Sequence, residues 1–259
     1  MRRSPSGRLY ITDLDGTILE SKETVLKRAL LEQIPELEKR GHCFAVASGR
    51  SYPELKKFFS SVLYNMLFIC ENGALIVYRG KVLKTLPVSA KTAETLMEYL
   101  EEQKLEWAAA GVHTIYTRGT SKRIPDDYRK QGLSVMKVKS HREIPEPILR
   151  ISVWCKELSQ ERLRSELETL ADGAVRTVYE NCIWLDFVAA GVNKGAAVRW
   201  LCSEYSICRE QVTAFGDNWN DVEMFDAAGD SYAMEWAPEG VKERALHTTS
   251  CVLKTIKTT

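Results

Sequence analysis

The chain has 259 residues, 36 of them basic and 35 acidic, for a net charge of +1. This balance gives no overall field that would recruit nucleic acid or an anionic membrane surface. No run of about 18 apolar residues occurs, and the basic start Met1-Arg2-Arg3 is not followed by the apolar stretch of a signal peptide. We therefore expect a cytoplasmic protein with neither membrane nor nucleic-acid partners.

In residues 10–17 a predicted strand gives way to a loop that carries two carboxylates, Asp13 and Asp15. Side chains at i and i+2 of an extended segment face the same way, so both can converge on one ligand before Gly16 allows a sharp turn. Because carboxylates this close repel each other, the pair predicts Mg²⁺ or split protonation states. The alternative is a simple Asp-Gly turn after a buried strand.

A second apolar run, residues 44–47, ends at Ser48, Gly49 and Arg50. The Ser48 hydroxyl and the Gly49 N–H can both hydrogen-bond a phosphate oxygen, so this turn suits an anion. The alternative is that Ser48 only caps the helix predicted over residues 53–59.

Between Leu86 and Phe187 lie about a hundred residues with their own alternation of helix and strand patterns, comparable to a small domain. Apolar spacing of three and four residues predicts one helix after Ser89 and another over residues 159–170. Six strand-like runs accompany them, at residues 107–110, 114–118, 135–138, 148–154, 175–179 and 183–187. These runs predict a sheet with two helices on one face.

Beyond this insert, Asn193 is the expected cap of a helix with Lys194 in its first turn. The helix dipole disfavours a cation in this turn, so the position of Lys194 favours a role in binding an anion. The alternative is a solvated lysine.

The strand predicted over residues 212–215 is followed by Asp217, Asn218, Asn220 and Asp221. Hard cations favour such oxygen ligands. The alternative is a solvated loop that caps the helix beginning near Val222.

These four segments, each at the carboxyl end of a predicted strand, resemble in order and type the motifs of the haloacid dehalogenase superfamily of phosphohydrolases. Residues 13–17 resemble the first motif, Ser48 the second, Lys194 the third and residues 216–221 the fourth. Residues 70–74, Cys-Glu-Asn-Gly-Ala, are similar to a signature of the Cof-type branch, subclass IIB.

The resemblance implies an α/β fold, with a Rossmann-like doubly wound parallel-sheet core and an inserted α+β cap domain. The core is expected in residues 1–86 and 187–259, and the cap in residues 87–186. The motifs cover only the core, whereas the insert agrees with the family in size and pattern.

The resemblance also implies a Mg²⁺-dependent phosphatase of small phosphorylated metabolites, with sugar phosphates favoured, that works through an aspartyl-phosphate. Asp13 would be the nucleophile, and Asp15 would act first as acid and then as base. The implied Mg²⁺ ligands are Asp13, the Asp15 carbonyl, Asp217 and Asp221. The implied phosphate-binding groups are Ser48, Lys194, Asn220, Thr17 and the N–H groups of Leu14 and Gly49. Thr17 and Asp221 are also expected to brace the loops.

Two other functions stay open: a phosphosugar mutase and a non-catalytic module that senses a phosphorylated metabolite. The intact Asp13, Asp15, Lys194 and Asp217 weigh against the sensor, which needs no acid/base group. The oligomeric state is left open.

Residues 234–237 depart from the family, since they read Met-Glu-Trp-Ala where relatives often read Met-Gly-Asn-Ala. We expect this acid and indole near the rim of the active site, where they would affect the leaving group or the cap.

The seven cysteines lack a C-x-x-C pair and indicate neither a disulfide framework nor a zinc site. The four histidines lack metal-ligand spacing, so we interpret them as surface or hydrogen-bonded core residues: His42, His113, His141 and His247.

Overall fold

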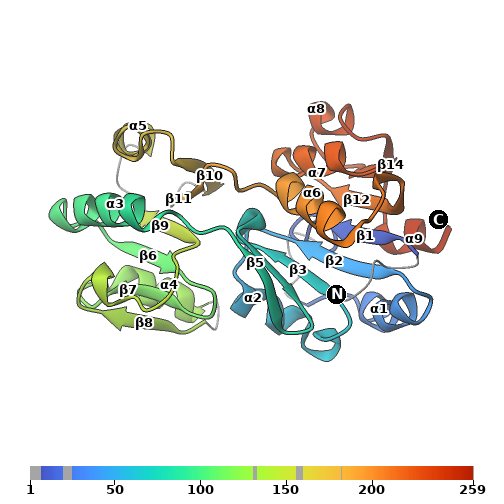
Figure 1. The fold of residues 1–259 in the computed structure, drawn as a ribbon, viewed down its shortest axis with the longest axis horizontal. Coiled ribbons are helices and arrows are strands. Elements are labelled where there is room, and N and C mark those ends of the chain that lie inside the picture. Colours follow the sequence, from blue (N-terminus) through green and yellow to red (C-terminus); the bar gives the residue numbers. More distant parts are fainter. Residues whose placement is uncertain (1–6, 20–24, 131–132, 156–159, 182, 259) are drawn as a thin grey trace. The chain divides into compact units, whose positions relative to one another are not determined.

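The computed structural model describes residues 7–19, 25–130, 133–155, 160–181 and 183–258 (Figure 1). Residues 1–3 and residue 159, on which two expectations rest, lie outside this range. The chain divides into two compact units: Met1–Lys84 with Asn193–Thr259, here called the core unit, and Thr85–Val192, here called the cap unit.

The unit boundaries differ from the predicted ones, which follow residues 86 and 186. The larger difference arises at strand β11 (Trp184–Ala189), which pairs with a neighbouring strand as far as Ala189. A boundary after residue 186 would cut this strand in two. The apolar sequence pattern locates the strand but not the sheet to which it belongs.

The core unit is built on an eight-stranded sheet in the order β14-β13-β12-β1-β2-β3-β4-β5. The pairs from β14 to β3 are parallel, and β4 runs antiparallel to β3. The apolar runs of β1 and β2 are buried without alternation, as expected of strands covered on both faces. The strands are β1 (Leu9–Thr12), β2 (Cys43–Ala47), β3 (Leu67–Cys70), β4 (Leu75–Tyr78), β5 (Lys81–Thr85), β12 (Val212–Gly216), β13 (Asp230–Met234) and β14 (His247–Thr249).

Helices cover both faces of this sheet (Figure 1). Helices α6 (Lys194–Tyr205) and α7 (Val222–Ala227) pack on the face that carries Leu9, Ile11 and Ala45. On the opposite face Tyr52 of α2 (Tyr52–Phe58) packs edge-on against Phe68 of β3. The remaining helices are α1 (Arg28–Lys39), α8 (Glu239–Lys242) and α9 (Val252–Thr258). The predicted α/β class is thereby confirmed.

The cap unit holds a six-stranded sheet in the order β10-β11-β9-β6-β7-β8, antiparallel except for the parallel pair β7-β8. Each strand-like run of the sequence contributes one strand: β6 (Trp107–Ala110), β7 (Ile115–Arg118), β8 (Val135–Val138), β9 (Arg150–Trp154), β10 (Val175–Asn181) and β11. The two predicted helices, α3 (Ala90–Glu102) and α5 (Gln160–Ala171), pack together on one face.

A third helix of the cap unit, α4 (Arg123–Lys130), is absent from the sequence prediction. Its Ile124 and Tyr128 pack with Ala108, on the opposite face of the sheet from Trp107 and Ala109. The expectation of helices on one face is therefore corrected. The helix has only eight residues and carries Pro125 in its first turn, too little for apolar periodicity to reveal.

None of the helices within the described ranges is long and apolar enough to cross a membrane.

Candidate active site

The site begins at the carboxyl end of β1, where Asp13 meets the third and fourth motifs. The Asp13 N–H donates to the Phe215 carbonyl of β12 at 2.9 Å, which holds the two strand ends together. Lys194 Nζ donates to Asp13 Oδ1 at 2.5 Å and to Asp221 Oδ1 at 2.6 Å. Lys194 is only 1% exposed, which excludes the solvated-lysine alternative.

The start of α6 explains how Lys194 reaches this position. Asn193 caps the helix as predicted, since its Oδ1 accepts the Ala196 N–H at 2.6 Å. Burial lowers the pKa of Lys194, but the carboxylates of Asp13 and Asp221 outweigh it and raise that pKa overall. Lys194 is therefore a buried ammonium ion, held by two carboxylates in the turn where the helix dipole disfavours it.

Three carboxylates gather around this lysine. Asp13, Asp217 and Asp221 each place a carboxylate oxygen within 4.8 Å of the others. Burial raises the pKa of Asp13 well above its ordinary value; Lys194 opposes this rise, and the charges of Asp221 and Asp217 add to it. Three acids around one ammonium give an excess of negative charge that a bound cation would offset.

The loops are braced by Thr17 and Asp221, as the sequence predicts. Asp221 Oδ2 accepts the N–H groups of Asp217 at 3.0 Å and Asn218 at 3.1 Å. Thr17 Oγ1 donates to Asp217 Oδ1 at 2.8 Å. Gly16 has φ +85°, and a Cβ there would lie 2.3 Å from Asp217 Oδ2, so only glycine lets the first and fourth motifs approach this closely.

Asp15 lies apart from the three clustered carboxylates. Arg50 Nε donates to its Oδ2 at 2.8 Å and Arg50 Nη2 to its Oδ1 at 2.7 Å, with the Asp15 side chain 49% exposed. Sequence reasoning placed Arg50 in a turn that suits an anion but missed this partner, because no local pattern pairs residues that are 35 positions apart.

Ser48 is buried, and its Oγ accepts the Arg50 N–H at 3.1 Å. The helix cap is a different serine: Ser51 precedes α2 and forms a capping box with Glu54. The alternative interpretation, in which Ser48 only caps the helix, is therefore wrong. Of the two expected backbone donors, Gly49 is half-buried, and the Leu14 side chain is fully buried.

Asn220 links the fourth motif to residues 70–74. Its Nδ2 donates to Asn72 Oδ1 at 3.4 Å, and the Asn72 N–H donates to the Ser48 carbonyl at 2.9 Å. Gly73 has φ +111°, and a Cβ there would lie 2.5 Å from the Asn193 carbonyl oxygen. This segment thus positions the second, third and fourth motifs, a role that its sequence signature does not reveal.

Trp236, where the chain departs from the family pattern, contacts the first motif. Its Nε1 donates to the Gly16 carbonyl at 2.7 Å although the residue is 53% exposed. The indole therefore ties the loop after β13 to the loop that carries Asp13 and Asp15.

Replacing this donor, Trp236→Phe, should lower the free energy of unfolding by about 0.5–1 kcal/mol, the usual worth of one hydrogen bond. Trp219→Phe is the matched control, since Trp219 is exposed to a similar degree. Chemical denaturation measures both. Equal losses in the two variants would mean that the Gly16 contact contributes nothing.

A parallel α/β sheet whose strand ends bring together clustered aspartates and a buried lysine defines an enzyme of the hydrolase type. The chain belongs to the haloacid dehalogenase-like hydrolases, whose family pattern it matches over residues 10–254. The superfamily expected from the four motifs is confirmed.

Two curated relatives come from Escherichia coli K12. One is 5-amino-6-(5-phospho-D-ribitylamino)uracil phosphatase YbjI, 27% identical over 90% of this chain and 87% of that protein. The other is pyridoxal phosphate phosphatase YbhA, 27% identical over 92% of this chain and 91% of that protein. Among solved structures, the subclass IIB sugar phosphatase BT4131 is 18% identical and covers 97% of this chain and 98% of that chain at a TM-score of 0.79. This likeness agrees with the expected subclass IIB fold.

Proposed function

We propose that the protein is a Mg²⁺-dependent phosphatase that hydrolyses small phosphorylated metabolites, sugar phosphates above all, through an aspartyl-phosphate intermediate. The observation that carries the proposal is the buried contact of Lys194 with Asp13 and Asp221, beside Asp217. The two curated relatives support the substrate class, because their names describe phosphatases of small phosphate monoesters.

Asp13 is the proposed nucleophile. A carboxylate needs no base to attack phosphorus, and Lys194 holds its Oδ1 while Oδ2 forms the new bond. The bond between phosphorus and the alcohol oxygen breaks in the same step. Water then attacks the phosphorus of the aspartyl-phosphate, which releases inorganic phosphate and restores Asp13.

The residues present suit a hard divalent cation. Carboxylates dominate the cluster, their charge exceeds that of Lys194, and the bare Cα of Gly16 leaves room for Asp217. Asp13, Asp217, Asp221 and the Asp15 carbonyl are the proposed ligands. Mg²⁺ bound there would screen the nucleophile from its anionic target and stabilise charge on the phosphoryl oxygens.

The phosphoryl oxygens are assigned to donors on the loops after the adjacent strands β12, β1 and β2 and at the start of α6. Lys194 and Ser48 are buried, and Asn220 donates to Asn72. The Leu14 and Gly49 N–H groups and Thr17 complete the proposed set. Such fixed donors stabilise the transition state because they need not reorganise as charge develops.

Phosphate release from a panel of sugar phosphates, pyridoxal phosphate and nucleotides, with Mg²⁺ and with excess chelator, tests this function. Release that requires Mg²⁺ and is strongest with small monoesters would support it. Metal-independent release would contradict the cation, and an isomerised sugar phosphate without free phosphate would identify a mutase instead.

Asp15 is the proposed acid and base, and it must leave Arg50 to reach the reacting oxygens. Asp15→Asn should lower kcat for sugar phosphates by about 10²–10⁴-fold, the range of general acid catalysis. In this variant the rate of aspartyl-phosphate formation should fall less with p-nitrophenyl phosphate than with sugar phosphates, because nitrophenolate leaves without a proton. Pre-steady-state release of alcohol or nitrophenol measures this step.

The matched control is Asp226→Asn, because Asp226 is half-exposed and accepts two hydrogen bonds from Arg244. It should leave the rate unchanged. If Asp15→Asn lowered the rate equally for the sugar alcohol and for nitrophenol as leaving groups, Asp15 would not be the general acid.

A further inference from the structure

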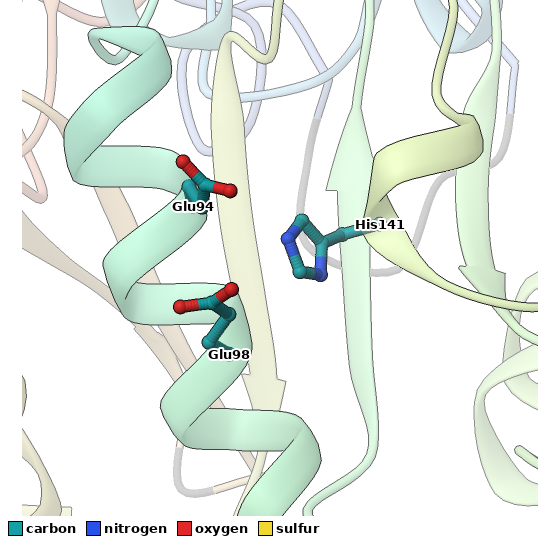
Figure 2. A group of neighbouring side chains, drawn as sticks. All are labelled: Glu94, Glu98 and His141. Atoms are coloured by element: carbon teal, nitrogen blue, oxygen red, sulfur yellow. The ribbon is translucent and has the colours of Figure 1, made fainter.

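A second group of potential metal ligands lies in the cap unit. Glu94 and Glu98 stand one turn apart on α3, and His141 begins a short 3₁₀ helix, His141–Glu143, that faces them (Figure 2). One ligand atom from each residue lies within 4.8 Å of the others. Residues at i and i+4 share a helix face, so both carboxylates are presented to the imidazole.

The imidazole of His141 is directed into this cluster. Its side chain is only 7% exposed, and Figure 2 shows a ring nitrogen turned toward Glu94 and Glu98. Nε2 is buried and has no hydrogen-bond partner among the described residues. Because buried polar atoms are nearly always satisfied, this nitrogen indicates a missing ligand.

The other ring nitrogen is held by Glu101. Glu101 Oε1 lies 3.2 Å from His141 Nδ1 and accepts the His141 backbone N–H at 3.1 Å. A carboxylate at Nδ1 keeps the proton on that nitrogen and leaves a lone pair on Nε2. Histidines that ligate metals show the same arrangement, with the second nitrogen donating to a carboxylate.

We propose that Glu94, Glu98 and His141 bind a first-row transition-metal dication, with Zn²⁺ as the best fit. Zn²⁺ accepts imidazole nitrogen together with carboxylate oxygen, whereas Mg²⁺ and Ca²⁺ prefer ligand sets made of oxygen. Bonds of about 2.0–2.2 Å in a tetrahedron need ligand atoms about 3.4 Å apart, so these flexible side chains close by an ångström or so. Three protein ligands leave a fourth position for water.

Arg142 is the competitor of the metal. Its Nη2 lies 3.5 Å from Glu94 Oε1 and also pairs with Glu98. The Arg142 side chain is 66% exposed, so it can turn to solvent when a dication takes its place. Without metal, Arg142 therefore offsets half of the charge of the carboxylate pair, and Zn²⁺ would offset all of it.

His141 is a hydrogen-bonded core residue, as the sequence predicts, and its Nε2 is in addition a metal ligand. Ligand spacing along the sequence could not reveal the site, because α3 and the His141 segment meet only through folding. A metal there would join them and stabilise the cap unit by mass action.

Calorimetric titration of the full chain with ZnCl₂ tests the proposal in a matched set of variants. Glu98→Gln should bind one Zn²⁺ fewer per chain than the wild type. Glu102→Gln, which removes an exposed glutamate of the same helix outside the cluster, should bind as the wild type does. Arg142→Gln should bind up to about fivefold more tightly, because an exposed ion pair is only a weak competitor.

The carboxylates around Asp13 also attract cations, so the set is repeated with Asp217→Asn. The Zn²⁺ lost in Glu98→Gln should be lost in both backgrounds, whatever the phosphatase assay shows. Equal Zn²⁺ stoichiometry in wild type and Glu98→Gln would overturn the site. So would a His141→Gln variant that melts cooperatively and still binds the additional ion.

Discussion

Asp13→Asn is expected to abolish phosphate release while leaving the fold intact. The amide has nearly the shape of the carboxylate but cannot attack phosphorus, so the loss should be on the order of 10⁴-fold or more. Lys194 keeps its second partner, since it also donates to Asp221 at 2.6 Å. The assay is phosphate release with the best substrate of the panel, and retained turnover would remove Asp13 from the role of nucleophile.

The same variant should lose no stability in chelator. A carboxyl whose pKa is raised by folding binds its proton more tightly in the folded state, so its ionisation above that pKa lowers stability. The pKa of Asp13 is raised in this way by burial and by its acidic neighbours. Asn carries no charge, and the denaturation midpoint of Asp13→Asn at neutral pH should equal or exceed that of the wild type. A clearly lower midpoint would mean that the Lys194 contact outweighs the burial of the charge.

Sequence reasoning succeeds where a local pattern has one structural solution. Apolar runs such as residues 44–47 and 212–215 predict buried parallel strands, and parallel strands place the residues at their carboxyl ends along one edge of the sheet. That is why Asp13 and Asp221 could be expected to meet, and they do. Lys194, at the start of α6, donates to both. The residue types at those ends then indicate the chemistry.

It fails where the deciding contact joins distant residues. The pair of Arg50 with Asp15 and the contact of Asn72 with Asn220 follow from tertiary packing, and no local period encodes either. Helix α4 is too short for a periodic signal, and the end of the cap unit depends on how β11 pairs. The role of His141 likewise depends on its three-dimensional neighbours.

Lys194→Met is expected to remove both activity and much of the stability of the core unit. Loss of one partner from a buried ion pair costs about 3–5 kcal/mol, because the carboxylates stay buried without compensation. Lys242→Met is the matched control, since Lys242 pairs with the exposed Glu239 at 2.8 Å and such pairs contribute about 1 kcal/mol or less. Denaturant unfolding in chelator measures both variants.

Mg²⁺ separates a charge effect from a packing effect in Lys194→Met. If the stability is lost because Asp13 and Asp221 repel each other, a dication among them should restore part of it. The gain should exceed that of the wild type, in which the ammonium of Lys194 opposes the cation. A variant that Mg²⁺ does not stabilise would show that the methionine side chain fits badly, or that the cluster binds no cation.

The double variant Asp13→Asn/Lys194→Met then tests whether Asp13 is the carboxylate whose charge Lys194 compensates. Removing Asp13 eliminates one of the carboxylates that Lys194 compensates, so the double variant should be more stable than Lys194→Met alone. The two changes should fall short of additivity by about 0.5–3 kcal/mol, the range for residues in direct contact. Strict additivity would mean that the 2.5 Å contact between Lys194 and Asp13 has no energetic weight, and that Asp221 is the partner that keeps this lysine buried.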